Sequence, residues 1–111
     1  MSVIVGPASI PPVTTSVALK DSEFHSLLHA QIRREFTASH QYLAIAIYFD
    51  SNDLPQLAQR FYTQATEERS HALMMVQYLL DRGIDVDLEG VDSVATRFSS
   101  IRDAVELSLN Q

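Results

Sequence analysis

A glutamate and a histidine three residues apart, Glu68 and His71, interrupt the apolar stripe of a segment that has the pattern of a long amphipathic helix. Residues at i and i+3 lie on one face of a helix, so both side chains can reach a common centre. A carboxylate oxygen together with an imidazole nitrogen suits iron, manganese or zinc. The spacing by itself is common by chance, and a partly buried ion pair between the two side chains is the alternative interpretation.

A second carboxylate, Glu35, lies at the centre of the apolar face of the preceding helical segment. Counted at about 100° per residue, the residues that share this face are Phe24, Leu28, Ile32, Ser39, Tyr42, Ala46 and Phe49. The same count from Glu68 gives Leu54, Leu57, Phe61, Ala65, Ala72, Met75 and Leu79. Each segment therefore places a carboxylate in the middle of the face that should pack against other helices.

The two glutamates are expected at the same height and in a dry environment. Glu35 precedes Asn52, in the connecting turn, by 17 residues, and Glu68 follows Asn52 by 16. Two long helices joined by a short turn must lie antiparallel, so the carboxylates should face each other. This arrangement is unfavourable, because both groups lose hydration and their charges repel.

A bound divalent cation would remove both costs, and no lysine or arginine shares either stripe near that height. The sequence therefore predicts a metal site formed by Glu35, Glu68 and His71, whose ligand types suit a transition metal. A protonated Glu35 that is hydrogen-bonded to Tyr42 is the alternative interpretation.

Five further side chains could take part in chemistry. Tyr42 lies on the same face as the first glutamate, either as a core aromatic or as a redox-active, hydrogen-bonding neighbour of the site. Glu67 lies on the flank of its helix and is expected to be solvated or to stand at an entrance. His25, His29 and His40 lie away from the buried line and are expected at the surface, although His25 and His29 have a chelating spacing.

The elements that must position these residues follow an uncharged, proline-rich start. Residues 1–20 hold three of the four prolines and no charge before Lys20, which predicts a flexible N-terminal extension and no signal peptide. Asp21 or Ser22 can cap the first helix. A pattern without glycine or proline then continues to about Asp50.

A turn and a second helix of similar length come next. The stretch "DSNDLP" has the composition of a turn, with Asn52 or Asp53 as the expected helix cap and Pro55 in the first turn. The second helix should run to about Arg82 and stop at Gly83, because glycine accepts the left-handed conformation that follows many helices. Each helix of about 28 residues corresponds to about 42 Å.

Residues 83–98 are expected to form a long crossover loop. They contain two glycines and four acidic residues with little helical period, and when extended they reach roughly 50 Å, enough to run back along a helix. The segment "SSIRDAVELSLNQ" then resumes a helical pattern, with Ser99 or Ser100 as cap, and should start parallel to the second helix. It reaches Gln111 without a helix-ending signal, so only the start of a third helix is expected.

These patterns predict a single all-α domain over residues 21–111. The expected fold is an antiparallel hairpin of long helices, half of a four-helix bundle, with the start of a third helix; its long crossover loop is a feature of ferritin-like bundles. The chain has 111 residues and a net charge of −6, which offers no basic patch to nucleic acid or to a membrane surface. It has no cysteine, which fits a cytoplasmic protein without disulfides or thiolate ligands.

The segment "REFTASHQYLAIAIYFDSNDLPQLAQRFYTQATEERSHALMMVQYLLDRG" resembles the first two helices of the non-haem bacterial ferritins, and "EFTASHQY" and "EERSH" are its most specific parts. The resemblance implies a ferroxidase centre in which Glu35 matches the first-helix glutamate, Glu68 the glutamate that bridges two irons and His71 a histidine ligand. Tyr42 matches the neighbouring tyrosine, and Glu67 matches an outer carboxylate on the iron path.

The resemblance covers residues 24–111 and implies oxidation of Fe²⁺ by O₂ or peroxide, with storage of ferric mineral inside a homo-oligomeric cage. The third-helix glutamate of the family would be expected just after Gln111, so a truncated ferritin-like chain is implied. Haem is not expected, because the only methionines are Met1, Met74 and Met75.

Three functions remain open from the sequence. Residues 42–49, "YLAIAIYF", are apolar nearly all round the helix, so two copies of the chain could form a four-helix bundle with Glu35, Glu68 and His71 from each. Such a pair would be an active ferroxidase. The alternatives are an inactive fragment that only associates through its helices, and another di-metal oxidase of the same bundle class.

Overall fold

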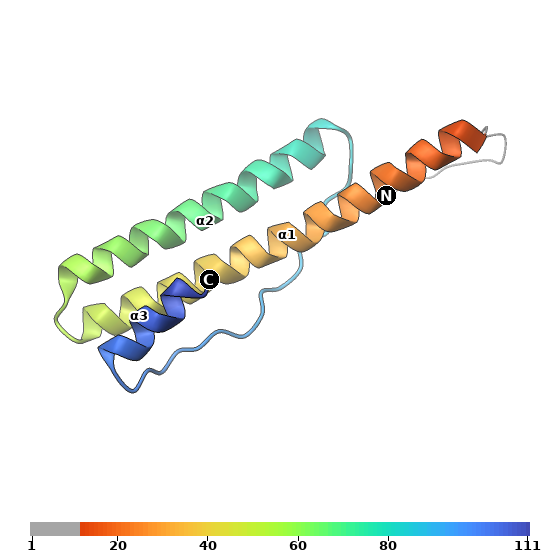
Figure 1. Cartoon of the computed structure of the whole chain (residues 1–111). Coiled ribbons are helices and arrows are strands. Elements are labelled where there is room, and N and C mark those ends of the chain that lie inside the picture. The colour runs from red at the N-terminus through yellow and green to blue at the C-terminus, as the bar shows by residue number, and fades with distance from the viewer. Residues whose placement is uncertain (1–11) are drawn as a thin grey trace.

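The computed structural model describes residues 12–111, with side chains from residue 22 onward. These residues form three helices and no strand: α1 Pro12–Ser51, α2 Pro55–Asp81 and α3 Ile101–Leu109. α1 and α2 lie side by side and antiparallel, and α3 packs beside α1 near the turn that joins them (Figure 1). The predicted all-α hairpin of long helices, with the start of a third, is confirmed.

α1 begins earlier than the sequence predicts. Its first residue is Pro12, and the helix passes through Asp21 and Ser22, the expected caps, without a break. Proline is tolerated in the first turn because its missing N–H would have no partner there, and no glycine or proline interrupts residues 13–51. Residues 1–11 of the predicted extension lie outside the part of the chain that the structure describes.

The turn between α1 and α2 uses its polar residues differently from the prediction. Neither Asn52 nor Asp53 caps α2, whose N-cap is Leu54 without a side-chain hydrogen bond. Instead, Asn52 Nδ2 donates to the backbone oxygen of Tyr48 (2.8 Å), and Asp53 has a left-handed backbone with φ of 59°. Asparagine and aspartate tolerate this conformation better than most residues. They therefore complete the end of α1, and Pro55 starts α2 as predicted.

α2 ends at the predicted place. After Asp81 the chain turns at Gly83, which has a φ of 71°. The N–H of Gly83 donates to the Leu80 oxygen and the N–H of Ile84 donates to the Leu79 oxygen, both at 3.0 Å. These two bonds form a Schellman motif, which satisfies the last carbonyl groups of the helix and favours glycine for its positive φ.

After α2 the chain runs back along α1 as an extended loop, residues 82–100 (Figure 1). Thr37 Oγ1 accepts a hydrogen bond from the N–H of Asp92 (3.1 Å). One turn further along α1, Gln41 donates to the Ala95 oxygen (2.8 Å) and accepts from the Ala95 N–H (2.9 Å). Gln41 is buried, so these bonds satisfy a side-chain amide that is shielded from water. The predicted crossover loop is confirmed.

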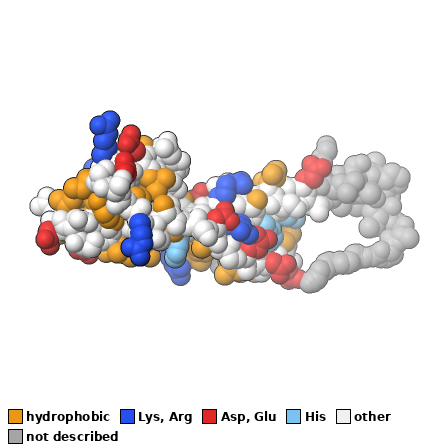
Figure 2. Space-filling view, turned by 90° about the horizontal axis from the view of Figure 1, so that it is seen from below, with side chains coloured by type: hydrophobic (Ala, Val, Ile, Leu, Met, Phe, Trp, Pro, Cys, Tyr) orange, Lys and Arg blue, Asp and Glu red, His pale blue; other side chains and the backbone are white. Residues whose placement is uncertain are grey.

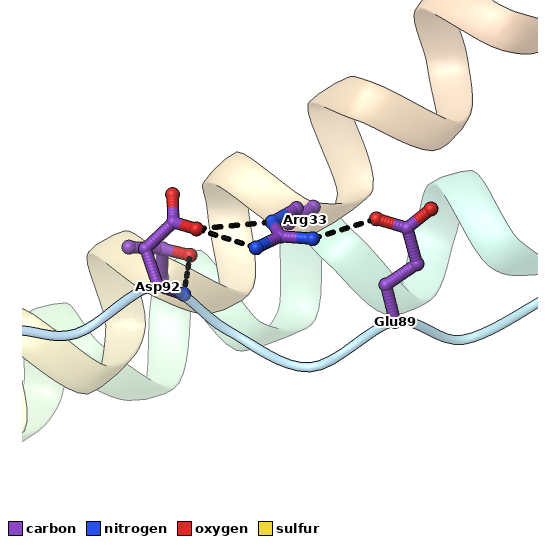
Figure 3. A network of polar contacts seen from close by, with 4 residues as sticks. Arg33, Glu89 and Asp92 are labelled. Carbon is purple, nitrogen blue, oxygen red and sulfur yellow. Dashed lines mark hydrogen bonds and ion pairs between the residues drawn. The ribbon is translucent and has the colours of Figure 1, made fainter.

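An exposed arginine holds the same loop one turn earlier on α1. Arg33 donates through Nη1 to Glu89 (2.8 Å) and through Nη2 and Nε to Asp92 (2.6 and 3.2 Å), as Figure 3 shows. The hydrogen bonds that Arg33 donates to Asp92 and Glu89 raise the pKa of Arg33. One guanidinium therefore pairs with both carboxylates at the surface and offsets part of their negative charge.

α3 begins at a predicted cap. The Ser100 hydroxyl accepts a hydrogen bond from the N–H of Asp103 (3.1 Å). The helix runs parallel to α2, as expected (Figure 1). Ala104 is fully buried in a cluster with Ile45 and Phe49 of α1, so α3 closes the core at the turn end of the hairpin.

The apolar core consists of two clusters separated along the hairpin. The cluster near the turn contains Ile45, Phe49, Ala58 and Ala104, and the other contains Ile32, Ala72 and Leu79. Glu35 lies between the two clusters on α1, and Glu68 lies between them on α2. Apolar packing is thus interrupted at the height predicted for the two carboxylates.

Large apolar side chains also remain at the surface. Figure 2 shows hydrophobic side chains gathered at the end of the molecule that carries the α1–α2 turn and α3. Ile47, Met74 and Leu109 are each more than half exposed, at 53%, 70% and 78%. Exposed apolar area of this kind is typical of a surface that meets another helix or chain. Within residues 12–111, no helix is long and apolar enough to cross a membrane.

Candidate metal centre

Glu35 of α1 meets Glu68 and His71 of α2 in the middle of the hairpin. One carboxylate oxygen from each glutamate and one ring nitrogen of His71 all lie within 4.8 Å of one another. His71 Nδ1 is 3.5 Å from Glu35 Oε1 and 3.5 Å from Glu68 Oε2. The predicted proximity of the three side chains is confirmed.

Small residues let the two helices approach each other at this height. Ala65 and Ala72, which flank Glu68 on the inner face of α2, are both buried. Ser39 of α1 donates its hydroxyl to the backbone oxygen of Ala65 (2.7 Å). Interhelical distance depends on the side chains at the contact, so this stripe of short side chains brings the Glu35 and Glu68 carboxylates together.

The two carboxylates are shielded, whereas the histidine is open to solvent on one side. The side chains of Glu35 and Glu68 are 17% and 18% exposed, and that of His71 is 57% exposed. Glu35 Oε1 is buried and has no hydrogen-bond donor, Tyr42 included. A buried oxygen without a donor is costly, and a cation bound beside His71 would satisfy it. The donor set and the unsatisfied oxygen therefore fit a divalent transition metal.

The electrostatics of the pair follow from its burial. Burial raises the pKa of Glu68, and the charge of Glu35 raises it further. Burial also raises the pKa of Tyr42, with smaller contributions from the charges of Glu68 and Glu35. The Tyr42 ring stacks on Phe61 with a centroid distance of 6.1 Å. A negative charge on Glu68 or on Tyr42 is thus disfavoured until a cation compensates it.

Sequence reasoning missed two glutamines that bind the glutamates. Gln31 Nε2 donates to Glu35 Oε2 (2.6 Å), and Gln64 Nε2 donates to Glu68 Oε2 (3.3 Å). Each glutamine stands four residues before its glutamate, a spacing at which glutamine and a carboxylate pair on a helix surface. This repeated spacing of glutamine and glutamate could have predicted the two hydrogen bonds from the sequence.

The other candidate residues lie outside this group. Glu67 is exposed and lines an open hollow of about 520 Å³ that also contains Thr63 and His71. The ring Nδ1 of His29 contacts the backbone oxygen of His25 (2.8 Å), so these two residues pair along the helix rather than through their rings. His40 is exposed, as predicted.

Residues 25–111 match the family described as a ferritin-like domain. The chain belongs to the ferritin-like family. It is 58% identical over 99 residues to ferritin BfrB of Mycolicibacterium smegmatis, which covers 89% of this chain and 54% of that protein. It is 36% identical over 84 residues to a bacterial non-heme ferritin of Staphylococcus aureus, which covers 76% of this chain and 51% of that protein.

Solved ferritin structures have the same fold. A crystal structure of a PmFTN variant soaked in iron superimposes with a TM-score of 0.75 at 34% identity, and covers 80% of this chain and 57% of that one. The ferritin-like chain spans about half the length of the curated relatives that it matches. A relative from Mycobacterium tuberculosis that is named a bacterioferritin is 57% identical over 90 residues. The expectation that haem is absent stays a prediction.

Proposed function

We propose that Glu35, Glu68 and His71 bind Fe²⁺ and that the chain acts as a ferroxidase in cytoplasmic iron storage. The observation that carries this proposal is the buried Glu35 Oε1, which has no donor and lies 3.5 Å from His71 Nδ1. Its relatives are named ferritins, and the structural neighbours include crystals soaked in iron. The grouped ligands thus have the chemistry that an iron substrate requires.

The anionic ligands favour oxidation of the iron. Two carboxylates attract Fe³⁺ more strongly than Fe²⁺, and the attraction is larger in a shielded site than in water. Each Fe²⁺ gives up one electron, so two irons supply the two electrons that reduce O₂ to hydrogen peroxide, with two protons taken from water. Peroxide would serve as the oxidant in the same way, and the ferric product would pass to a mineral.

The proposed centre holds two irons, with Glu68 as the bridging ligand that the family resemblance implies. Among the residues that the structure describes, Glu35, Glu68 and His71 are the one group of this composition. Ligands for a second iron would come from a second copy of the chain or from further sequence of the kind that the longer relatives have. The exposed apolar side chains near the turn, such as Ile47, support a homo-oligomer.

Two neighbours receive supporting roles in this proposal. Tyr42, held by its stack on Phe61, would act as a redox or hydrogen-bonding partner beside the glutamates. Glu67 would receive incoming Fe²⁺ at the open hollow, from which His71 is accessible. Each role requires a side chain that lies close to the metal ligands and is not held elsewhere by a strong hydrogen bond or ion pair.

Stopped-flow oxidation of added Fe²⁺ in air tests the proposal. Glu68→Ala should slow the fast phase of oxidation by at least about tenfold, because it removes a ligand and not a supporting contact. Glu106→Ala is the matched control, since it removes an exposed glutamate of α3 that pairs with Arg102. Equal fast phases in the parent and Glu68→Ala would contradict the proposed centre.

The competing function is helix association without turnover, and the exposed apolar surface favours it as the alternative. Native mass spectrometry combined with metal analysis separates the two functions. A metal-free oligomer that does not oxidise Fe²⁺ supports the association-only function, whereas a metal-free monomer indicates an inactive fragment. A third class, a manganese-dependent oxidase of the same bundle type, would show faster turnover with Mn²⁺ than with Fe²⁺.

A further inference from the structure

The two oxygens of Glu35 have different surroundings. Oε2 accepts a short hydrogen bond of 2.6 Å from Gln31 Nε2, one helical turn earlier on α1. Oε1 is buried without a donor and faces His71 Nδ1 at 3.5 Å. The protein therefore holds one oxygen in place and leaves the other for whatever lies between Glu35 and His71.

Arg34 fixes the orientation of the Gln31 amide. The Gln31 carbonyl oxygen Oε1 accepts from Arg34 Nε (3.0 Å) and Arg34 Nη2 (2.8 Å). A guanidinium has only donors and a carboxylate has only acceptors. A reversed amide would place its NH₂ group against the guanidinium of Arg34 and its oxygen against Glu35, and both contacts would be repulsive. The amide can satisfy both neighbours in one orientation only.

Two other glutamines show what is particular about this arrangement. Gln64 donates to Glu68 at the same spacing, but at 3.3 Å. Gln77 donates to Asp81 at the same spacing and at 2.8 Å, on the exposed end of α2. The pairing is thus a general helix contact, and the pair at Gln31 differs because the carboxylate is shielded and the amide is itself held.

We infer that Gln31, oriented by Arg34, is a positioning residue that makes Glu35 a one-oxygen ligand, through Oε1, for a divalent cation. The inference rests on the proposed function, since it concerns the same site. Loss of a group that holds a metal ligand through a hydrogen bond typically weakens metal binding by about 10- to 100-fold. Without Gln31, the Glu35 carboxylate is free to rotate and to bind with both oxygens.

Anaerobic titration with Co²⁺, followed by visible absorption, tests the role of Gln31. The affinity reports how well the ligands are held, and the absorption bands report the coordination geometry without any turnover. Gln31→Ala should bind Co²⁺ about tenfold more weakly or worse, with altered bands. Gln77→Ala removes the same kind of hydrogen bond far from the site and should bind like the parent.

Substitution of Arg34 tests the orientation mechanism while Gln31 stays intact. In Arg34→Glu, the new carboxylate accepts, so it attracts the Gln31 NH₂ group away from Glu35. Co²⁺ binding should weaken although the added negative charge attracts cations. Arg69→Glu makes the same charge change beside Glu68 and should bind as tightly as the parent or more tightly. Arg34→Lys keeps one donor to Gln31 and should restore most of the affinity.

The outcomes separate this inference from the proposed function. If the parent binds Co²⁺ and Gln31→Ala binds it equally well, the positioning role is wrong and the metal site stands. If Arg34→Glu binds more tightly, as Arg69→Glu does, the orienting role of Arg34 is wrong. A parent that binds no Co²⁺ overturns both. Arg34 is exposed, so its variants should fold. They therefore test the inference even if Gln31→Ala does not fold.

Discussion

Arg33 and Glu35 are two residues apart on α1, and each meets carboxylates from elsewhere in the chain. At the surface, Arg33 forms ion pairs with both Glu89 and Asp92 of the crossover loop (Figure 3). In the hairpin interior, Glu35 meets Glu68, and the basic group in contact is a histidine at 3.5 Å. In the first cluster a protein donor binds each carboxylate, whereas in the second a buried carboxylate oxygen has no donor.

This difference shows why an acidic cluster is not by itself a metal site. Glu89 and Asp92 are about 60% exposed and already paired, so a cation would gain little from them. Glu35 and Glu68 are shielded, and burial raises the pKa of Glu68. A bound cation would therefore gain more at the second cluster than at the first.

Exchange of one carboxylate for an amide in each cluster should give the largest contrast. Glu35→Gln removes a charged ligand and should weaken Co²⁺ or Fe²⁺ binding by at least about 100-fold, whereas Asp92→Asn should leave it unchanged. In the metal-free protein, the new amide can donate to Glu68, so Glu35→Gln should raise unfolding stability by about 1 kcal/mol. Metal titration and urea unfolding measure the two effects. Equal metal affinity in both variants would remove the distinction between the clusters.

The loop contacts offer a second contrast, between partly buried and exposed hydrogen bonds. Gln41→Ala removes both hydrogen bonds to Ala95 together with a buried side chain, and should cost about 1–3 kcal/mol of unfolding stability. Arg33→Ala removes only exposed ion pairs, so its cost should be smaller and should vanish at high salt. Chemical denaturation at low and high salt measures both. A larger, salt-independent cost for Arg33→Ala would contradict this order.

The smallest expected effect is a pH dependence of stability in the metal-free protein. Burial and Glu35 raise the pKa of Glu68 in the folded state, so the folded chain binds more protons than the unfolded chain between the two pKa values. The contribution of Glu68 to stability is therefore favourable below the unfolded pKa, about 4.3, and is lost as pH rises through the folded pKa.

Urea unfolding from pH 4 to pH 7 of the parent and of Glu68→Gln measures this effect. The variant should lose less stability than the parent over that range, because its amide carries no charge at any of these pH values. A saturating divalent cation should remove the difference in slope by stabilising the charged form. A parallel pH dependence in both metal-free proteins would show that the raised pKa of Glu68 has no effect on folding.

The main features of the site were predictable because they follow from periodicity and register. A helix turns by a constant angle, so Glu35 and Glu68 could be assigned to inner faces, with His71 one turn after Glu68 and within its reach. The short turn set the common height of the two glutamates. Gly83 and Ser100 were predictable for the same kind of reason, since each satisfies a local backbone requirement at a helix end.

Other features depend on which of several possible partners a polar side chain binds, and a local sequence pattern does not decide this. Asn52 and Asp53 are good caps by type, but the tight turn uses them to finish α1, so α2 starts without a side-chain cap. The roles of Gln31 and Gln41 depend on their hydrogen-bond partners. Gln31 binds a neighbouring carboxylate, and Gln41 binds a residue of the crossover loop that is 54 positions away. The contact of Gln41 depends on the path of the crossover loop, which no local sequence pattern gives.

Anaerobic titration calorimetry of Fe²⁺ into the parent and into His71→Ala tests the central claim most directly, because His71 is the ligand candidate that contacts both carboxylates. The parent should bind Fe²⁺ with a saturable heat, and His71→Ala should bind it at least about tenfold more weakly. Identical heats and affinities in the two proteins, or no saturable binding to the parent, would contradict the claim that this hairpin carries an iron site.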